Sequence, residues 1–309
     1  MLSHSNRRAF LRDATLVAAG AVGGLAGGLF PLSAPAIEPV PRSDLGKARF
    51  KFSLAAYSYR DLLTGKSPKL SLDDFIVDCA KMGLEGTELT SYYFPENVTG
   101  DYLRHVKNLS FRLGLDITGT AVGNDLCLPP GKARDEQIAL VKRWVDNAEI
   151  LGAPVIRIFS GKAGQGQAKA DAHRLAVAGM EECCDYAGKH GTFLALENHG
   201  GLTTEVDDLL ALVRDVNSPW FGVNMDTGNF RSSDIYGDLA KLAPYSINVQ
   251  VKVSIEPAGG TRQKSDFRRL AQILTTAGYR GYIVLEFEEK EDPRVACPPL
   301  MDELRKAFS

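Results

Sequence analysis

The stretch Phe193-Leu-Ala-Leu-Glu-Asn-His-Gly200 joins four mostly apolar residues directly to three polar ones. A short apolar run of this kind is typical of a parallel strand that is covered on both faces. The run ends abruptly in Glu197, Asn198 and His199. The stretch therefore predicts a buried parallel strand whose carboxyl end carries polar chemistry.

The same pattern recurs three times toward the C-terminus. Apolar runs lead into Asp226, into Gln250 and into Glu286. One acid after a strand is most often a solvated loop residue, but four consecutive strands with the same placement predict a shared polar site. Active sites of (β/α)8 barrels lie at the carboxyl ends of the strands. We therefore expect the polar site to be formed by Glu197, Asp226, Gln250 and Glu286.

Strand and helix patterns alternate along the chain after the first 48 residues. The expected strands cover residues 50–57, 83–89, 115–122, 154–159, 192–197, 220–225, 246–252 and 282–287. The expected helices begin at Ser71 and then cover about residues 101–113, 133–151, 169–190, 204–215, 236–242, 265–278 and 298–307. Eight such units predict a (β/α)8 TIM barrel over residues 49–309. A doubly wound open sheet is the alternative, but the GxGxxG turn that would favour it is absent from the sequence.

The N-terminus has the features of an export signal. Ser5-Asn-Arg-Arg-Ala-Phe-Leu11 resembles a twin-arginine motif, and a Gly/Ala-rich run and Ala34-Pro-Ala36 follow it. We expect a twin-arginine signal peptide over residues 1–36, a linker over residues 37–48, and a mature protein in the periplasm or cell envelope. The apolar run is short and glycine-rich for a membrane span. An uncleaved anchor and a chance arginine pair are the alternatives.

The amino-acid composition limits the classes of molecule that the protein is expected to bind. The formal net charge is -2, with 36 Lys and Arg against 38 Asp and Glu, which argues against nucleic acid. The five cysteines show no CxxC spacing, so we expect them to be mostly buried thiols. The composition predicts no nucleic-acid partner, and the N-terminal run predicts no stable membrane span after signal cleavage. The sequence leaves open whether the protein forms a homo-oligomer.

The four strand-end side chains suit a divalent metal held by oxygen. Carboxylates without a cation would repel one another and raise each other's pKa. Oxygen ligands favour Mg, Mn or Ca, and Zn or Co are also compatible. The sequence predicts one divalent metal (Mn, Mg, Zn or Co) bound by Glu197, Asp226, Gln250 and Glu286.

At these residues the sequence resembles the sugar phosphate isomerase/epimerase family, which has a xylose isomerase-like TIM barrel within the AP endonuclease 2 superfamily. The resemblance covers about residues 49–306 and is carried by Leu194-Ala-Leu-Glu-Asn-His199, Asn224-Met-Asp-Thr-Gly-Asn229, Gln250-Val-Lys252 and Gly281-Tyr-Ile-Val-Leu-Glu-Phe-Glu288. It implies that Glu197, Asp226 and Glu286 are metal ligands. Gln250 stands where the family has a histidine ligand, and a neutral amide is a weaker ligand than imidazole.

The resemblance also implies a metal-dependent sugar isomerase or epimerase, whose predicted partner is a small-molecule sugar or glycoside. Its reaction would transfer a proton beside a carbonyl through an enediolate, with the metal polarising the carbonyl. Glu197 and Glu286 would be the acid and base, and Lys252 would stabilise the oxyanion or bind an anionic group. A strand-end lysine that reaches solvent is the alternative for Lys252.

Several polar residues near strand ends are candidates for substrate binding, although packing or surface roles are alternatives for each. They are Tyr57, Glu88, Asn124, Arg157 and His199. His199 is also an alternative nitrogen ligand for the metal, but a hydrogen bond to a sugar hydroxyl is the favoured role.

Two other functions are open at this point. Exported barrels of this group include lyases or hydratases of 3-keto-glycosides, whose chemistry also begins with removal of a proton beside a ketone. A non-catalytic sugar-binding protein is the second alternative, because Gln250 already departs from the family's ligand pattern. DNA repair is excluded by the small number of histidines, five in all, and by the absence of a basic excess.

Overall fold

The computed structural model describes Gly46 and residues 48–309. The predicted signal peptide and all of the linker except Gly46 and Ala48 lie outside the described residues. Of the helices that are described, none has the length and hydropathy that a membrane crossing requires.

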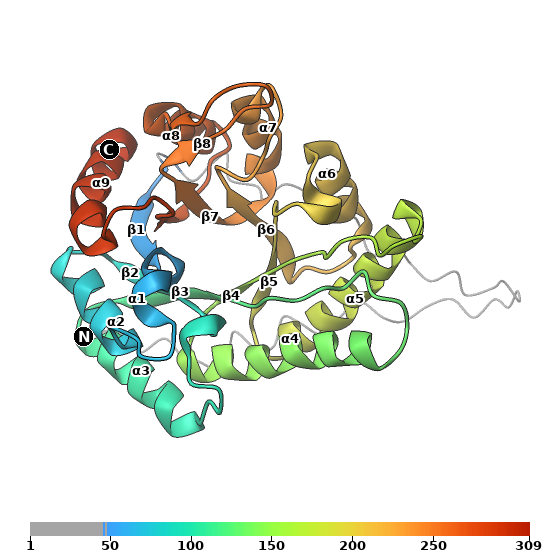
Figure 1. The fold of residues 1–309 in the computed structure, drawn as a ribbon, viewed down its shortest axis with the longest axis horizontal. Helices are drawn as coiled ribbons and strands as arrows, with labels where there is room; N and C mark the ends of the chain where they lie inside the picture. Colours follow the sequence, from blue (N-terminus) through green and yellow to red (C-terminus); the bar gives the residue numbers. More distant parts are fainter. Residues whose placement is uncertain (1–45, 47) are drawn as a thin grey trace, which may run out of the picture. The chain divides into compact units, whose positions relative to one another are not determined.

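Eight parallel strands close into a barrel, in the order β1-β2-β3-β4-β5-β6-β7-β10, with β10 pairing back onto β1 (Figure 1). The strands are β1 (Phe50–Ala55), β2 (Gly86–Thr90), β3 (Asp116–Ala121), β4 (Val155–Ile158), β5 (Phe193–Glu197), β6 (Phe221–Asp226), β7 (Ser246–Lys252) and β10 (Gly281–Glu286). This arrangement confirms the predicted (β/α)8 barrel. The strands are short and almost wholly buried, as expected where helices cover the outside and side chains fill the inside.

A helix follows each strand of the barrel, so the predicted alternation is also confirmed. These helices are α2 (Leu72–Lys81), α3 (Gly100–Arg112), α4 (Lys132–Leu151), α5 (Lys169–Lys189), α6 (Val206–Asp215), α7 (Ile235–Leu242), α8 (Phe267–Thr276) and α9 (Pro293–Phe308). Ser71 caps α2 in a capping box with Asp74, because each side chain bonds the other residue's backbone N–H. Gly152 ends α4 in the left-handed conformation.

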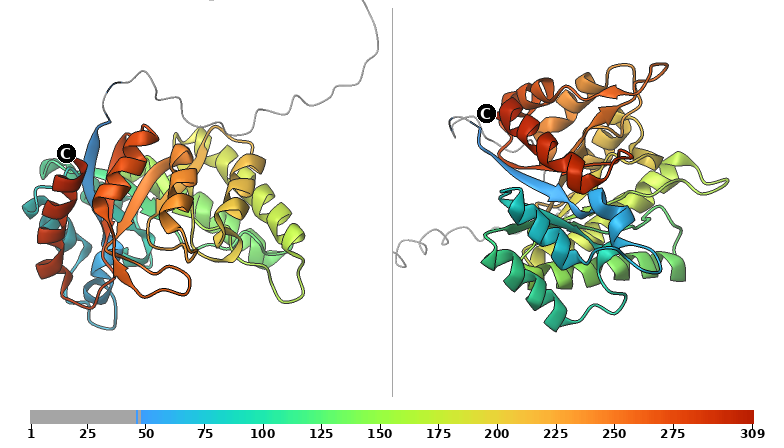
Figure 2. Two further views of the ribbon diagram at one scale, coloured as in Figure 1. Left: turned by 90° about the horizontal axis from the view of Figure 1, so that it is seen from above. Right: turned by 60° about the vertical axis from the view of Figure 1, so that its left-hand side comes forward.

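The last helix begins five residues earlier than the sequence predicted. Asp292 caps α9 by accepting a hydrogen bond from the Arg294 N–H, and Pro293 occupies the first turn, where a missing N–H costs nothing. The proline pair at 298 and 299, which we expected to start the helix, instead lies inside it. Figure 2 shows α9 beside β1, where Phe308 packs edge-on against Phe50 at a centroid distance of 5.2 Å.

Short elements surround the carboxyl end of the barrel. They are α1 (Arg60–Leu63), the 3-10 turns η1 (Ala56–Tyr59), η2 (Ser91–Tyr93) and η3 (Gly201–Thr203), and a two-stranded antiparallel sheet of β8 (Ser254–Ile255) and β9 (Gln263–Lys264). A further 3-10 turn, η4 (Ala243–Tyr245), directly precedes β7 at the opposite end of the barrel. The sheet was not predicted. Ser254 and Arg262 both donate hydrogen bonds to Glu289, at 2.7 and 2.6 Å, and so fasten the loop after β7 to the loop after β10.

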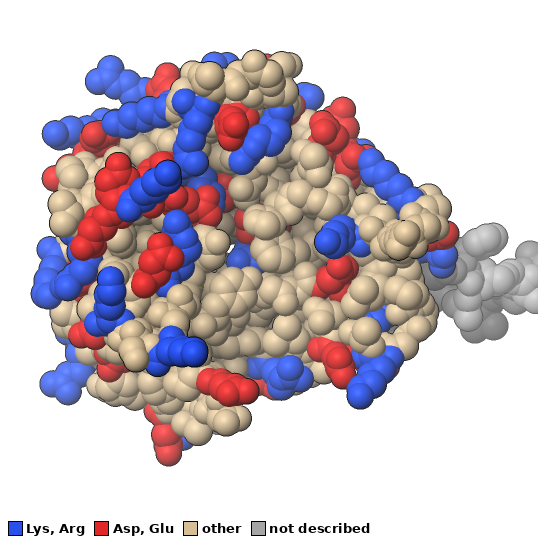
Figure 3. Space-filling view, in the orientation of Figure 1, with Lys and Arg blue, Asp and Glu red and all other residues tan. Residues whose placement is uncertain are grey.

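All five cysteines are buried, unpaired thiols, in agreement with the prediction from their spacing. Lysine and arginine side chains are intermingled with aspartate and glutamate side chains across the face drawn in Figure 3. No single sign of charge dominates that face, which agrees with the near-neutral composition.

Candidate active site

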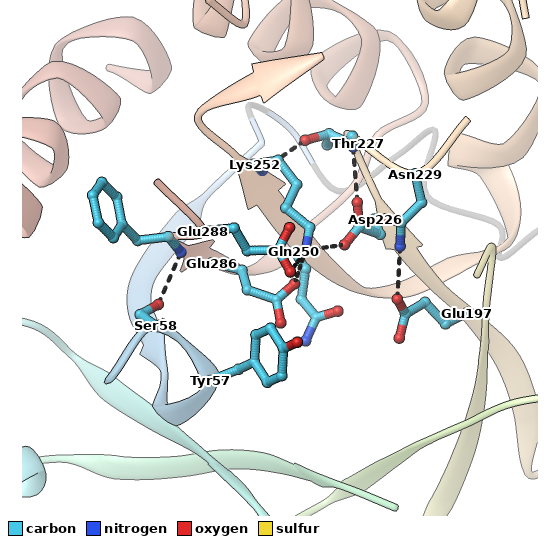
Figure 4. Close-up of polar contacts among 12 residues, drawn as sticks. Tyr57, Ser58, Glu197, Asp226, Thr227, Asn229, Gln250, Lys252, Glu286 and Glu288 are labelled. Atoms are coloured by element: carbon cyan, nitrogen blue, oxygen red, sulfur yellow. Dashed lines mark hydrogen bonds and ion pairs between the residues drawn. The ribbon is translucent and has the colours of Figure 1, made fainter. Parts of the chain in front are cut away.

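A lysine lies at the centre of the acidic side chains at the carboxyl end of the barrel. The Nζ atom of Lys252, the last residue of β7, is 2.8 Å from Glu286 Oε2, 2.8 Å from Glu288 Oε1 and 3.4 Å from Asp226 Oδ2. We call these four residues the lysine–acid cluster, and Figure 4 shows the three carboxylates pointing toward the ammonium group. The Lys252 side chain is only 8% exposed.

The surrounding backbone holds Lys252 in this position. Its N–H donates to Thr227 Oγ1 at 2.9 Å. Gly228 lies against the lysine stem so closely that an added Cβ would be 2.6 Å from Lys252 Cγ. A larger residue than glycine would displace the stem. The ring of Tyr57 lies 5.9 Å from the ammonium, at the range where a cation–π attraction contributes.

The charges in the cluster have opposite effects on the individual pKa values. Burial disfavours the charged form of Lys252, but the negative charges of Asp226, Glu286 and Glu288 outweigh it and raise the lysine pKa well above its ordinary value. Burial likewise acts to raise the pKa of Glu286, but the charge and hydrogen bond of Lys252 reverse this and lower it. Burial dominates for Asp226, whose pKa is raised well above its ordinary value.

Glu197 belongs to a separate ion pair beside the cluster. Its Oε2 is 2.8 Å from Arg157 Nε, and its Oε1 accepts a hydrogen bond from Asn229 at 2.9 Å. Arg157 is itself fixed by donating to the Val122 carbonyl and by lying 4.0 Å from the ring centroid of Phe159. Burial raises the pKa of Glu197, although the charge of Arg157 opposes this. The pKa of Glu197 is therefore shifted upward, whereas the pKa of Glu286 is shifted downward.

Gln250 does not face the acids with which it was predicted to converge. Its Oε1 accepts from Asn224 at 2.7 Å, and its Nε2 donates to Glu88 Oε1 at 2.6 Å. Asn248 donates to both Glu88 and Asn224. We call Glu88, Asn224, Asn248 and Gln250 the amide network. Inward residues of a strand recur every second position, so Gln250 lies one layer deeper in the barrel than Lys252.

Strand irregularities accompany the amide network. The pairing register shifts between Thr87 and Glu88 on β2 and between Val223 and Asn224 on β6. Such bulges redirect side chains. Both residues that follow a shift, Glu88 and Asn224, belong to the network, so neither is available at the mouth of the barrel.

We predict that Glu88 makes stability depend on pH. Burial, aided by the charge of Glu286, raises the Glu88 pKa to about 7, against the hydrogen bonds from Asn248 and Gln250. Between its ordinary value of 4.5 and 7, the folded protein keeps a proton that the unfolded chain has released, so the free energy of unfolding should fall as pH rises through this range. The full shift corresponds to about 3 kcal/mol.

Urea unfolding of the wild type and of Glu88→Gln at about pH 5 and about pH 8 measures this dependence. In Glu88→Gln the free energy of unfolding should fall less between about pH 5 and about pH 8 than it does in the wild type. Glu182→Gln changes an exposed carboxylate paired with Lys142 and should show the same fall as the wild type. An unchanged decrease in Glu88→Gln would contradict the prediction.

Two asparagines tie neighbouring strand ends together. Asn124 donates to the Phe159 carbonyl at 2.7 Å and accepts from the Phe159 N–H at 3.0 Å. Asn198 makes the same pair of bonds with the backbone of Asp226, both at 2.9 Å. Asn124 was predicted to bind substrate, but its amide is already used to join the loop after β3 to the end of β4.

Two of the predicted substrate residues, His199 and Tyr57, are more exposed. His199 is exposed, and its ring packs on Phe159 at a centroid distance of 4.5 Å. Tyr57 is half-buried in η1. Burial, together with the charges of Glu288 and Glu286, raises the pKa of the Tyr57 hydroxyl, which therefore stays protonated and can donate a hydrogen bond.

Sequence reasoning missed Glu288, Asn229 and the asparagines of the amide network. Three of these residues could have been found from the alternation of side chains along a strand, because each of the three lies two residues from a predicted site residue. Glu288 follows Glu286 at this spacing, Asn224 precedes Asp226, and Asn248 precedes Gln250. Nothing comparable marks Asn229, which lies in the loop after β6.

The side chains as they lie do not form the predicted metal site. Glu197 is bound to Arg157 and Asn229, and Gln250 is bound within the amide network. Over residues 48–309, no group of three acidic, histidine or cysteine side chains is arranged to hold a metal ion. Asp226 and Glu286 face the Lys252 ammonium, so the arrangement of donors fits an internal cation.

Comparisons with known proteins agree with the fold. A family model described as xylose isomerase-like TIM barrel matches residues 76–307. A candidate hydroxypyruvate isomerase of Mus musculus is 28% identical over 164 residues, covering 47% of this chain and 57% of that protein. The match therefore spans little more than half of the relative's length.

Solved structures give the same architecture. D-psicose 3-epimerase from Clostridium cellulolyticum H10 aligns with a TM-score of 0.68 and 15% identity, covering 84% of this chain and 99% of that one. A 3-keto-D-glucoside 4-epimerase from E. coli aligns with a TM-score of 0.64 and 16% identity, covering 84% and 100%. At these identities the likeness shows the fold alone.

Proposed function

Because the chain belongs to the xylose isomerase-like TIM barrel family, we propose that it is a sugar isomerase or epimerase that transfers a proton beside a carbonyl group through an enediolate. The observation that supports this most is the placement of two carboxyl groups with opposite pKa shifts, Glu197 and Glu286, around one buried end of the barrel. Such divergence is typical of an acid and base pair.

In this proposal Glu286 is the base that removes the proton from carbon. Its contact with Lys252 keeps it ionised at neutral pH. Glu197 is the acid that returns a proton, because burial raises its pKa. The Lys252 ammonium stabilises the negative charge that develops on the carbonyl oxygen. Tyr57, His199 and Arg157 bind sugar hydroxyls, while Glu88 and Asn124 support the site through their contacts inside the barrel.

A 3-keto-glycoside lyase or hydratase is the second candidate. It needs the same first step, followed by loss or addition of oxygen at the neighbouring carbon. The predicted twin-arginine signal favours this substrate class, because an exported enzyme encounters glycosides more readily than phosphorylated sugars. We propose that the protein acts in the periplasm or cell envelope after export by this route.

Proton exchange with solvent tests the proposal without knowledge of the product. The protein is incubated in D2O with D-psicose, a 3-keto-D-glucoside and hydroxypyruvate, and deuterium incorporation is followed by proton NMR. We expect deuterium at the carbon beside the carbonyl of at least one compound. Isomeric sugars as products would identify an isomerase or epimerase, and loss of the neighbouring oxygen would identify a lyase. Saturable binding without exchange would instead identify a non-catalytic sugar-binding protein.

A further inference from the structure

We propose that the Lys252 ammonium is the resident cation of this site and stands where the family resemblance predicts a divalent metal ion. The inference deepens the proposed function and rests on it only for the part that the cation plays in the reaction. The presence of the cation itself is a binding property that can be measured without substrate.

The first argument is the number of partners. A lysine ammonium has three N–H donors and no acceptor. Lys252 Nζ has three carboxylate neighbours, with Glu286 and Glu288 at 2.8 Å and Asp226 at 3.4 Å. Glu286 and Glu288 lie within hydrogen-bonding distance of the ammonium, whereas Asp226 Oδ2 has no hydrogen-bond partner among the described residues and meets the ammonium only as an ion pair. The three acids thus converge on the ammonium.

The second argument is that the Lys252 ammonium and a divalent ion cannot occupy the same site, because of their size and their like charge. A divalent ion bound to these oxygens at about 2.0–2.2 Å would lie close to the ammonium and be strongly repelled by it. Metal binding would therefore require the ammonium to move away from the three acids. Displacement is opposed by burial of the side chain and by its packing against Gly228.

The third argument comes independently from Gln250, the position at which the family has a histidine ligand. Both atoms of its amide are bound within the amide network, to Asn224 and Glu88. Freeing the oxygen for a metal would leave the buried Asn224 amide without its acceptor, which is costly. Gln250 is thus committed elsewhere and Glu197 is paired with Arg157. The two remaining predicted ligands, Asp226 and Glu286, face the lysine.

Equilibrium dialysis tests the proposal directly. The full chain is freed of metal with EDTA, dialysed against Mn²⁺ at pH 7, and analysed for bound Mn by mass spectrometry. We compare the wild type with Lys252→Met, which removes the ammonium but keeps an apolar stem. The matched control is Lys241→Met, because Lys241 also lies near two carboxylates, those of Asp207 and Asp238, but is 54% exposed on α7.

We expect Lys252→Met to bind about one equivalent of Mn²⁺ and at least about 10²-fold more tightly than the wild type, with Lys241→Met unchanged. If Lys252→Met does not fold alone, Mn²⁺ added during refolding should restore its circular dichroism spectrum. One tightly bound equivalent in the wild type would overturn the proposal, as would failure of Lys252→Met to gain metal or to be rescued by it. Absence of deuterium exchange would instead overturn the proposed function and leave the dialysis result intact.

Discussion

Glu286→Gln is expected to slow deuterium exchange beside the substrate carbonyl by about 10²- to 10⁴-fold, which is the usual contribution of a general base. The substitution keeps the size and most of the shape of the side chain but removes its negative charge. Since an amide oxygen is far less basic than a carboxylate, it cannot accept the proton from carbon. The amide can still accept a hydrogen bond from Lys252, so the fold should be retained.

The rate of exchange in D2O measures this effect, with circular dichroism as the test of folding. Glu182→Gln is the matched control, because it makes the same chemical change in an exposed ion pair with Lys142 on the outer surface. Exposed ion pairs contribute little to stability, so the exchange rate of Glu182→Gln should equal that of the wild type. A folded Glu286→Gln protein that exchanges at the rate of the wild type would show that another group is the base.

Lys252→Met is expected to slow exchange by about 10²- to 10³-fold, as the loss of one group that stabilises an oxyanion does. It should also destabilise the metal-free protein by about 3–5 kcal/mol, because removing one partner leaves buried carboxylates without compensation. The carboxylates of Asp226, Glu286 and Glu288 would then have raised pKa values in the folded state. The variant should therefore recover stability as pH falls, since these groups take up protons more readily when folded.

Urea unfolding at about pH 8 and about pH 5, in the presence of EDTA, measures the stability of Lys252→Met. Lys142→Met removes a half-buried lysine from an ion pair with the exposed Glu182 on the outer surface and should change the free energy of unfolding by less than about 1 kcal/mol. Wild-type stability of Lys252→Met at pH 8 would contradict the idea that the ammonium holds the cluster together. A loss of stability that does not diminish at low pH would indicate a packing defect instead of unpaired charge.

The sequence alone was sufficient for the architecture, because the signals for strands and helices are local. The apolar run Phe193–Leu196 predicts a buried strand from its own composition, and Ser71 and Gly152 mark helix ends through their own backbone chemistry. The alternation of such signals predicts the barrel, and the barrel in turn predicts that Glu197, Asp226 and Glu286 lie at its carboxyl end. The largest displacement is at the start of α9, where Asp292 caps the helix ahead of the proline pair. The start of β2 was displaced by three residues, from 83 to 86, and the β8–β9 sheet was not predicted.

The tertiary structure decided how those side chains are paired. Glu88 and Gln250 are 162 positions apart in the sequence, yet they share a hydrogen bond inside the barrel. The depth of a side chain depends on strand tilt, register and bulges, which arise only when the barrel closes. For this reason the sequence could place Gln250 and Lys252 on one strand, but it could not determine their partners. The Gln250 amide bonds within the amide network, whereas the Lys252 ammonium contacts three acids. Strand periodicity is a local property of the chain, whereas the partner of a buried charge is set by closure of the whole barrel.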